Sequence, residues 1–532
     1  MNQSDTFFLP ESVYNHFIAI TQRPHPSANQ DGVIGNEDPV REYVIAQAQE
    51  IPNVKVVVYD QGATQPGDRV IVLKRPGSGI YANKLPVILQ AHMDMVYNPV
   101  DMAFPLNVIV DPNRPGQGKW IKAMENKGRN STLGADDGLG VATALALLAD
   151  DNLKAYPLEC LFTVQEETDM GGAMNFDLKS LTGKQLLNLD AEDLPVIIFG
   201  SAGGCATSYQ GIINRIPIPG NYTTLQLSIT GLRGGHSGVD INKGRLNAIK
   251  VMTQALARLD KRITALDISG DGIQSYDLLL CDIKRCDVKK SNAIPAEAQA
   301  VIVIPTEQAD QFTVDFKAFC TALKTQNLPE ENNFTYDATT TGTTYQALDE
   351  KSTDNLLGLL QQIPHGVIAM IPDVPGVVET STNLYDITID GNNVTIGSSN
   401  RSSRDASLAA LSNVQANIGT IFQFIVAINL ESYPSWQPNP NSPLLKIAET
   451  VYSAMYGDQC EITVIHAGLE CGTISARYEE VGVTMDCISI GPTIRDPHSP
   501  NESLQVQATD GTETVQKFYN AVSQILGKIF AA

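Results

Sequence analysis

The 532-residue sequence lacks any run of about 18 apolar residues, the length that a helix needs to cross a bilayer. Its first ten residues contain neither a basic segment nor a sustained apolar one, so they do not resemble a signal peptide. The eight cysteines are scattered, and no Cys-x-x-Cys pair occurs among them. These absences argue against a membrane partner and favour a cytoplasmic protein with reduced thiols.

Basic residues are also scarce. The chain has 37 Lys and Arg against 59 Asp and Glu, a net charge of −22, which argues against a nucleic-acid partner. The hydrophobic content of 43% is that of an ordinary globular protein. Because a chain of this length exceeds what one core supports, we expect two or three domains.

Several catalytic signatures are missing. There is no His-Glu-x-x-His helix of the one-zinc proteases, and no P-loop or Gly-x-Gly-x-x-Gly follows an expected strand. The segment from Gly235 to Val239 fails the nucleophile-elbow pattern because its final Gly is absent. The sequence therefore offers no support for these classes of enzyme.

An apolar segment over 85–91 predicts a buried strand that ends in His92 and Asp94. Two residues apart on a strand, these side chains project from the same face. An imidazole beside a carboxylate is typical of a metal ligand and the partner that orients it. The alternative is a strand end with two polar residues turned to solvent.

Acidic residues follow other elements of the first 200 residues in the same way. They are Asp136 and Asp137 in a glycine-rich turn before an Ala/Leu-rich helix, Glu166 and Glu167 after a strand over 158–165, and Asp190 after a strand that begins at 185. An N-cap role explains one acid of the adjacent pair at 136–137, but not both. In open α/β sheets such strand ends meet at one crevice. Since burying each uncompensated ion costs several kcal/mol, converging carboxylates point to bound cations.

The alternation of strands and helices over residues 1–208 predicts an α/β fold with a mixed sheet flanked by helices. From residue 209 the composition becomes β-rich and polar, which indicates an inserted α+β domain over 209–435. Residues 436–532 restore the alternation and complete the first domain. We also expect a polar loop from the His92 strand to Lys127, and a helix over 406–429.

A loop after the last expected strand adds His498 to the candidates. The resulting set of metal ligands is His92, Asp136, Glu167, Asp190 and His498. Imidazoles with carboxylates suit zinc, or manganese or cobalt in its place. Five ligands are too many for one tetrahedral ion, but they fit two ions when one carboxylate bridges. Glu166 is then placed to deprotonate a water between the ions and to pass the proton to a leaving amine.

Motifs spread in order over nearly the whole chain resemble those of the co-catalytic di-zinc exopeptidases. They are His92-Met-Asp94, Gly134-Ala-Asp136-Asp137-Gly138, Glu166-Glu167-Thr-Asp-Met-Gly-Gly172, Asn188-Leu-Asp190, Gly234-Gly-His236-Ser-Gly238 and Pro497-His498-Ser-Pro500. That family includes carboxypeptidase G, the aminoacylases, tripeptidase T and the carnosinases. Further strings are similar to its carnosinase-like branch, the bacterial aminoacyl-histidine dipeptidases: Pro24-His-Pro-Ser27, Gln90-Ala-His-Met-Asp-Met95, Asn292-Ala-Ile-Pro295, Val378-Glu-Thr-Ser-Thr-Asn383, Arg401-Ser-Ser403 and His466-Ala-Gly-Leu-Glu-Cys-Gly472.

The resemblance implies a role for each matching residue. Asp136 would bridge two Zn²⁺ ions per subunit, for which Mn²⁺ or Co²⁺ could substitute. His92 and Asp190 would complete one ion's ligands, and Glu167 and His498 the other's. Asp94 would orient His92, and Glu166 would be the general acid/base. The Asp136–Asp137 peptide bond would be cis.

The inserted domain would act as a lid and form a homodimer; the alternative is a monomer in which this larger domain imitates a partner subunit. The family uses the residue matching His236 to polarise the scissile carbonyl, often from the partner subunit. Arg401 would bind the C-terminal carboxylate of the substrate, with Asn383 assisting. His466 and Glu470 would line the substrate pocket.

The implied activity is metal-dependent hydrolysis of Xaa-His and related small peptides, including β-alanyl-histidine, by a metal-bridging water that Glu166 activates. One alternative is another di-zinc amidohydrolase, an aminoacylase or a tripeptidase. Others are a non-catalytic peptide-binding relative and a structural protein that merely binds metal. The chain is longer than typical members, with additional loops expected around 30–37 and 437–441.

Overall fold

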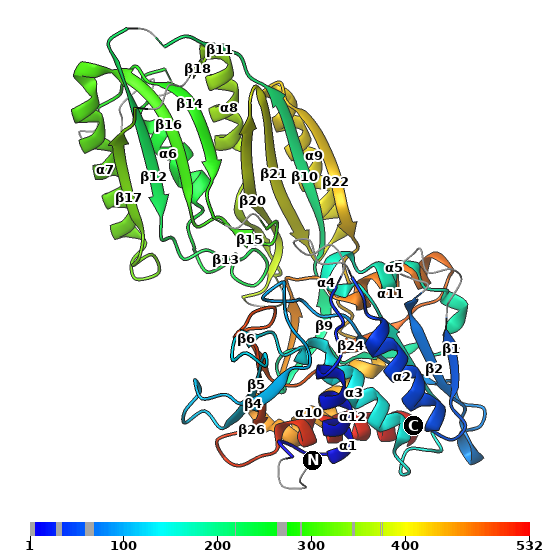
Figure 1. The fold of residues 1–532 in the computed structure, drawn as a ribbon. Helices are drawn as coiled ribbons and strands as arrows, with labels where there is room; N and C mark the ends of the chain where they lie inside the picture. Colours follow the sequence, from blue (N-terminus) through cyan, green and yellow to red (C-terminus); the bar gives the residue numbers. More distant parts are fainter. Residues whose placement is uncertain are drawn as a thin grey trace. The chain divides into compact units, whose positions relative to one another are not determined.

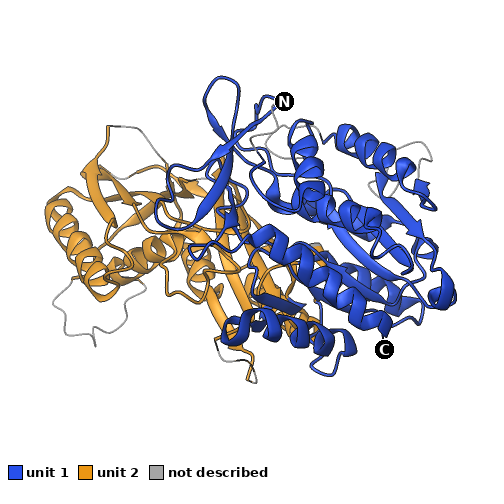
Figure 2. Ribbon diagram, turned by 90° about the horizontal axis from the view of Figure 1, so that it is seen from below, with its two compact units in different colours: residues 1–201, 436–464, 469–532 blue, residues 202–435, 465–468 orange. Residues whose placement is uncertain are grey.

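The structure is a computed structural model that describes residues 6–27, 35–58, 69–218, 220–262, 274–287, 290–342, 346–372, 374 and 376–531 (Figure 1). Most of the expected loop at 30–37 lies outside these residues. The chain forms two compact units, coloured separately in Figure 2. Unit 1 comprises residues 1–201, 436–464 and 469–532, and unit 2 comprises 202–435 and 465–468. The chain thus enters unit 2 after residue 201, whereas we had expected the insertion to begin at 209.

Unit 1 is built on a mixed eight-stranded sheet. Its strands, in spatial order, are β1 (Lys55–Val58), β2 (Ile71–Arg75), β7 (Leu158–Thr163), β3 (Val87–His92), β8 (Gln185–Asn188), β24 (Asp486–Ser489), β9 (Val196–Ser201) and β23 (Glu461–Ile465). The four strands β7, β3, β8 and β24 run parallel to one another, and the β1–β2, β2–β7 and β24–β9 pairs are antiparallel. The expected mixed sheet is confirmed.

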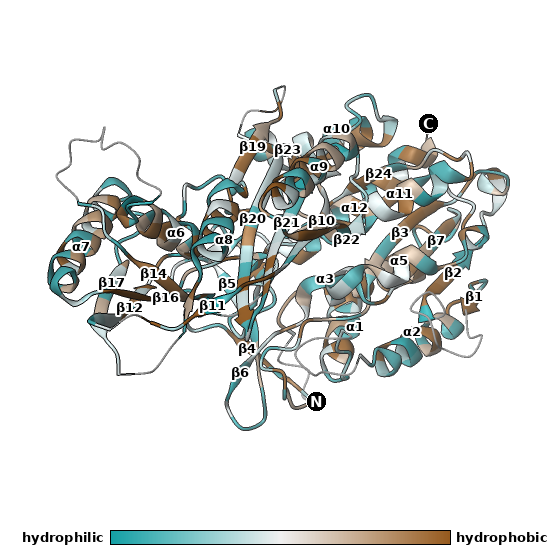
Figure 3. Cartoon of the chain, turned by 90° about the horizontal axis from the view of Figure 1, so that it is seen from above, coloured by the Kyte–Doolittle hydropathy of each residue, from teal (hydrophilic) through white to brown (hydrophobic). Residues whose placement is uncertain are grey.

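The parallel strands are buried on both faces, which explains their continuous apolar sequences. All six residues of β3 and all six of β7 are buried. Figure 3 shows hydrophobic residues gathered along β2 and β3. Helices pack around this sheet: α1 (Glu11–Thr21), α2 (Asp38–Glu50), α3 (Ala135–Ala149), α10 (Pro443–Tyr456), α11 (Glu470–Glu480) and α12 (Thr514–Ala531). Helix α3 is the most deeply buried of these and packs on β3 and α1.

A second, smaller sheet of unit 1 contradicts the expected loop up to Lys127. It orders β25 (Ile494–Arg495), β26 (Ser503–Gln507), β5 (Lys119–Met124) and β4 (Asn107–Val110), and β6 (Asn130–Ser131) also pairs with β5. Strand β5 buries Trp120 and Ile121, but its partner β26 lies near the other end of the chain. Because that pairing is remote in sequence, the local composition of the segment concealed it.

Unit 2 is an α+β structure with two antiparallel sheets. One sheet orders β14 (Leu279–Arg285), β16 (Ala298–Pro305), β12 (Tyr222–Thr230) and β17 (Thr335–Thr340) and packs with α6 (Ala248–Leu259) and α7 (Ala309–Gln326). The other orders β19 (Gly366–Met370), β20 (Val378–Asp390), β21 (Asn393–Ser402), β10 (Gly203–Ile212) and β22 (Ile425–Tyr433) and packs with α9 (Asp405–Ile421). Helix α8 (Glu350–Gln362) contacts α6 and α9, and short pairs join β11 (Arg215–Ile216) to β18 (Ala347–Leu348) and β13 (Gly235–His236) to β15 (Ala293–Ile294).

The expected helix over 406–429 is wrong at its C-terminal end. Helix α9 ends at Ile421, and β22 begins at Ile425. Gln423 takes a positive φ of 64°, which breaks the helix, and the β-branched residues that follow pair with β10. Tertiary pairing therefore overrides the helical pattern there.

The structure also bears on the cysteines and on membrane-spanning helices. All eight cysteines are free. Within the described ranges, the helices include none with the length and apolar character to span a bilayer.

Candidate active site

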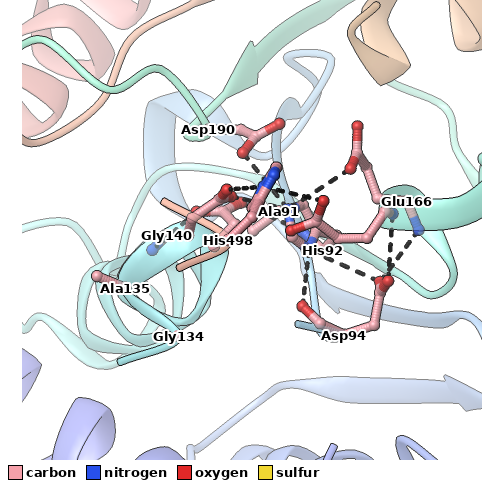
Figure 4. Close-up of polar contacts among 12 residues, drawn as sticks. Ala91, His92, Asp94, Gly134, Ala135, Gly140, Glu166, Asp190 and His498 are labelled. Atoms are coloured by element: carbon pink, nitrogen blue, oxygen red, sulfur yellow. Dashed lines mark hydrogen bonds and ion pairs between the residues drawn. The ribbon is translucent and has the colours of Figure 1, made fainter. Parts of the chain in front are cut away.

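Five elements of unit 1 deliver polar side chains to one place, at the carboxyl ends of the parallel strands. Strand β3 ends in His92, and the turn after β8 carries Asp190. The turn after β7 leads into α4 (Glu166–Asp169), the start of α3 carries Asp136, and the loop between β25 and β26 carries His498. Figure 4 shows His92, Asp190 and His498 converging. This is the crevice at which open α/β sheets bind ligands.

The two carboxylate oxygens of Asp136 face two different imidazoles. Oδ1 lies 3.1 Å from Nε2 of His92, and Oδ2 lies 2.9 Å from Nε2 of His498. His92 Nε2 is also 3.5 Å from Asp190 Oδ1, and His498 Nε2 is 3.0 Å from Glu167 Oε2. Two groups of three ligand atoms, His92–Asp136–Asp190 and Asp136–Glu167–His498, therefore share Asp136.

These residues fit a pair of divalent ions. Two ligand atoms on a tetrahedral zinc ion, each at about 2.0–2.2 Å, lie roughly 3.3–3.6 Å apart, close to the separations found here. Glu167 Oε1 is buried and has no hydrogen-bond partner among the described residues, as expected of an oxygen that needs a cation. The ligand atoms of a third group, His92, Glu166 and Glu167, also lie within 4.8 Å of one another.

Burial and mutual repulsion perturb the acids of this cluster. Burial raises the pKa of Asp190 to about 6, against the nearby His92 imidazole, which lowers it. Burial also raises the pKa of Glu166 well above its usual range; His92 opposes this shift, and the charge of Glu167 adds to it. For Asp136, burial raises the pKa, but the neighbouring His498 and His92 rings outweigh it and hold the pKa below its ordinary value. The cluster thus concentrates negative charge that bound cations would neutralise.

His92 is held in one tautomer by the turn that follows it. Its Nδ1 lies 2.9 Å from the backbone oxygen of Asp94, so Nδ1 carries the proton and Nε2 presents its lone pair to the cluster. The nearest contact of the Asp94 carboxylate with this ring is longer, at 3.6 Å. That carboxylate instead accepts from the backbone N–H groups of Glu166 and Glu167, at 3.1 and 3.3 Å, and from the Ser27 hydroxyl at 2.7 Å. Asp94 therefore ties the His92 strand to the turn that carries the two glutamates.

Asp137 has a different task from its neighbour. Its carboxylate accepts from the backbone N–H of His92 at 3.2 Å and of Gly140 at 3.1 Å. Asp136 and Asp137 have non-helical φ/ψ angles, so the second bond caps the regular part of α3 that follows them, a role of the kind expected for one acid of the pair. The Asp136–Asp137 peptide bond is cis, as expected.

Glu166 lies beside the cluster. Its Oε2 is 4.0 Å from His92 Nε2, and 14% of its side chain is exposed. Gln165 takes a positive φ of 59°, which turns the chain sharply as it leaves β7. A partly exposed acid at the rim of the ligands can reach a water molecule there.

Two residues expected in the site, His236 and Asn383, lie in unit 2 and are linked through the β13–β15 pair. His236 Nδ1 accepts from the backbone N–H groups of Gly238 and Val239, at 3.1 and 3.3 Å, so the proton of the neutral ring is on Nε2. Asn383 Nδ2 donates to the backbone oxygen of Ala293, the residue that pairs with His236 in the β13–β15 ladder. Asn383 thus braces the strand next to His236.

The other two unit 2 candidates also lie near one another. Arg401 is 8% exposed, donates to the Tyr433 hydroxyl at 2.8 Å, and has a buried Nε without an acceptor among the described residues. His466 Nε2 is 2.7 Å from the Ser381 hydroxyl. Burial and the charge of Arg401 lower the pKa of His466 to about 3, which keeps the ring neutral.

Glu470 belongs to unit 1 and is fully buried. Its Oε2 accepts from Gln90 Nε2 at 2.5 Å and from Thr163 Oγ1 at 2.7 Å. The structure therefore places the Glu470 carboxylate between the ends of β3 and β7.

The structure adds two residues whose contacts the sequence did not reveal. Ser27 bonds Asp94, and Glu502 accepts from the backbone around Asp136. Burial raises the pKa of Glu502 to about 7; the backbone N–H donors oppose this shift, and the charge of Asp136 adds to it. The available signal for Glu502 was its place four residues after His498, in the same loop.

Comparison with known proteins matches residues 88–523 to the model of peptidase family M20/M25/M40. The cytosol non-specific dipeptidase of Escherichia coli K12 is 32% identical over 523 residues, covering 98% of each chain. The crystal structure of aminoacylhistidine dipeptidase from Vibrio alginolyticus is 31% identical, with a TM-score of 0.76 and coverage of 99% of this chain and 98% of that one. A tripeptidase structure from Staphylococcus aureus shares the fold at 14% identity and a TM-score of 0.54, over 99% of this chain and 100% of that one.

The family model covers most of the chain and includes all five residues of the metal-ligand set. The two relatives above 30% identity are aligned along almost their whole length. The chain therefore belongs to peptidase family M20/M25/M40.

Proposed function

We propose that the protein is a metal-dependent dipeptidase that hydrolyses Xaa-His and related dipeptides, including β-alanyl-histidine. The observation that carries this proposal is the position of Asp136 between two imidazoles, with Glu166 at the rim of the same cluster. The two relatives above 30% identity, whose names are non-specific dipeptidase and aminoacylhistidine dipeptidase, support the substrate class.

The metal-holding residues in this proposal are His92, Asp136, Glu167, Asp190 and His498, with zinc as the ion and manganese or cobalt as substitutes. When bound, two such ions would lower the pKa of a water molecule and polarise the scissile carbonyl. Glu166 accepts the proton of the attacking water and returns it to the leaving amine. Its raised pKa suits a group that must both take and give a proton near neutral pH.

Unit 2 supplies the other roles in the proposal. The Nε2–H of His236 donates to the carbonyl oxygen as negative charge develops on it. Arg401 binds the substrate carboxylate through the guanidinium nitrogen that lacks an acceptor among the described residues. Asn383 and His466 serve the same pocket, the former by bracing the strand beside His236.

We further propose a cytoplasmic homodimer that forms through unit 2, which acts as the lid. Large apolar side chains are exposed on its five-stranded sheet and α9, with Ile212 80%, Ile421 72% and Ile425 76% exposed. Sedimentation of the wild type and of Ile425→Lys tests this: the wild type should sediment as a dimer and the variant as a monomer.

The experiment that tests the activity measures hydrolysis of β-alanyl-histidine and a panel of Xaa-His dipeptides. It compares purified protein, chelator-stripped protein, protein restored with zinc or manganese, and Glu166→Ala. We expect activity to vanish on stripping, to return with metal, and to be absent in Glu166→Ala. Cleavage of acyl-amino acids or tripeptides alone would overturn the substrate class, and no hydrolysis by metal-loaded wild type would favour a peptide-binding protein.

A further inference from the structure

A buried carboxylate outside the proposed ligand set accepts hydrogen bonds from the segment that carries Asp136. Glu502 is fully buried, and each of its oxygens receives two backbone N–H groups. Oε2 accepts from Leu133 at 2.7 Å and from Gly134 at 2.9 Å, and Oε1 accepts from Ala135 at 2.8 Å and from Asp136 at 3.3 Å. One side chain thus satisfies four consecutive backbone donors, the last of which belongs to Asp136.

The conformation of this segment suits a carboxylate. Gly134 takes a positive φ of 71°, which helps the successive N–H groups face the same side. Leu133 and Gly134 precede α3, and Ala135 and Asp136 are its first two residues, so the helix gives none of these donors a partner of its own. Among the described residues, no Lys or Arg side chain forms an ion pair with Glu502, so the N–H groups are what compensates its charge.

Glu502 also belongs to the loop that carries His498. Strand β26 begins at the next residue, Ser503, which pairs with Lys122 of β5, so the end of the loop is anchored in the small sheet. His498 Nε2 lies 2.9 Å from Asp136 Oδ2. The Glu502 carboxylate therefore joins the two segments that supply Asp136 and His498, which are far apart in sequence.

We propose that Glu502 is a positioning residue for the metal cluster: by clamping residues 133–136 to the His498 loop, it sets the placement of Asp136 relative to His498 and thereby the affinity for metal. The inference rests on the proposed function only in that the cluster binds metal. Partners that hold the ligands of a metal site commonly change metal affinity by about 10–100-fold when they are removed.

The test compares Glu502→Gln and Glu502→Asp with a matched control, Glu159→Gln. A glutamine keeps the shape of the side chain but turns an NH₂ group toward two N–H donors. Glu159 is 2% exposed and accepts from the backbone N–H groups of Thr182 and Gly183, but it lies at the start of β7, away from the end that leads to Glu166. Its substitution weakens the same kind of backbone interaction, together with a 3.0 Å ion pair to Lys74, without touching the segment at 133–136.

For each folded protein, zinc affinity is measured by chelator competition, together with the melting temperature of the stripped form. We expect about 10–100-fold weaker zinc binding in Glu502→Gln, a smaller loss in Glu502→Asp, and affinity within about twofold of wild type in Glu159→Gln. The inference is overturned if Glu502→Gln lowers the melting temperature as Glu159→Gln does but leaves zinc affinity unchanged. If Glu502→Gln does not fold, the same comparison is decided by Glu502→Asp.

These readouts separate the inference from the proposed function. A wild type that binds two zinc ions but cleaves no dipeptide defeats the proposed function and leaves the role of Glu502 standing. A wild type that binds no zinc defeats both. A lower kcat with an unchanged KM in a Glu502 variant at saturating zinc would indicate that the ligands are misplaced. A general loss of folded protein would instead be seen equally in the Glu159→Gln control.

Discussion

The ring of His92 is oriented by the backbone oxygen of Asp94, at 2.9 Å from Nδ1, and not by the Asp94 carboxylate, which lies 3.6 Å away. This leaves the carboxylate to hold the N–H groups of Glu166 and Glu167. Asp94 therefore positions the proposed metal ligand His92 through its main chain and the proposed general acid/base Glu166 through its side chain. Substitution of the side chain separates these two effects.

Asp94→Ala should lower kcat more than it lowers the affinity for metal. The substitution removes the acceptor for the Glu166 and Glu167 N–H groups but retains the backbone oxygen that orients His92. We expect kcat for a dipeptide to fall by about 10²-fold or more, with metal affinity reduced by about tenfold through displaced Glu167. Steady-state kinetics at saturating zinc and chelator competition measure the two quantities. Loss of metal with full kcat on reloading would contradict this division.

Glu166→Gln tests whether Glu166 is a base or a ligand, because it also falls in one of the ligand groups with His92 and Glu167. Glutamine preserves the shape but cannot accept a proton. We expect kcat to fall by about 10²–10⁴-fold while zinc content stays at the wild-type value. Metal analysis of the purified variant gives the answer: a loss of one ion would make Glu166 a ligand.

Stripping the metal should destabilise unit 1. Without cations, the closely spaced carboxylates of Asp136, Glu167 and Asp190 repel one another, and Glu167 Oε1 finds no hydrogen-bond partner in the described part of the chain. Zinc at 100 times its dissociation constant would add about 2.7 kcal/mol to the free energy of unfolding for one site. Calorimetry of the stripped protein with increasing zinc should show a rising melting temperature. If the five residues did not bind metal, the melting temperature would not rise.

The sequence predicted the large sheet because its strands are locally encoded. The buried runs that form β3, β7 and β8 are continuous and apolar, and each ends in a polar side chain. The small sheet could not be predicted in this way. Strand β5 pairs with β26 near the C-terminus, and no local pattern signals a partner so remote in sequence.

The proposed ligand set could be predicted from the sequence because acids and histidines at strand ends converge in any open α/β sheet. The supporting contacts were not. Glu502 binds backbone N–H groups, which every residue except proline offers, so its partners at 133–136 leave no trace in residue identity. The same holds for Asp94, whose carboxylate accepts hydrogen bonds from the backbone N–H groups of Glu166 and Glu167.

His365 of unit 2 should make the protein sensitive to acid. Burial lowers the pKa of His365 to about 4, and the charge of Lys250 adds to the effect. A lowered folded-state pKa contributes stability that is present above the unfolded value of about 6.5 and is lost as pH falls through about 4. His365→Gln cannot take up a proton, so its melting temperature should fall less than that of wild type between pH 7 and pH 4. Equal falls would show that the ring does not titrate in this window.

Two glycines in the first turns of α3 should respond differently to the same substitution. A Cβ atom at Gly140 would overlap Asp137 Oδ1, the oxygen that accepts the Gly140 N–H. We expect Gly140→Ala to cost roughly 1–3 kcal/mol and to weaken metal binding, because the other oxygen of Asp137 holds the N–H of His92. The control is Gly138→Ala, whose Cβ would lie 3.3 Å from Ile20 Cγ2, a contact that a small shift relieves, while alanine is the better helix former. Equal losses of melting temperature and zinc affinity in the two variants would contradict a specific role for Asp137 in holding β3.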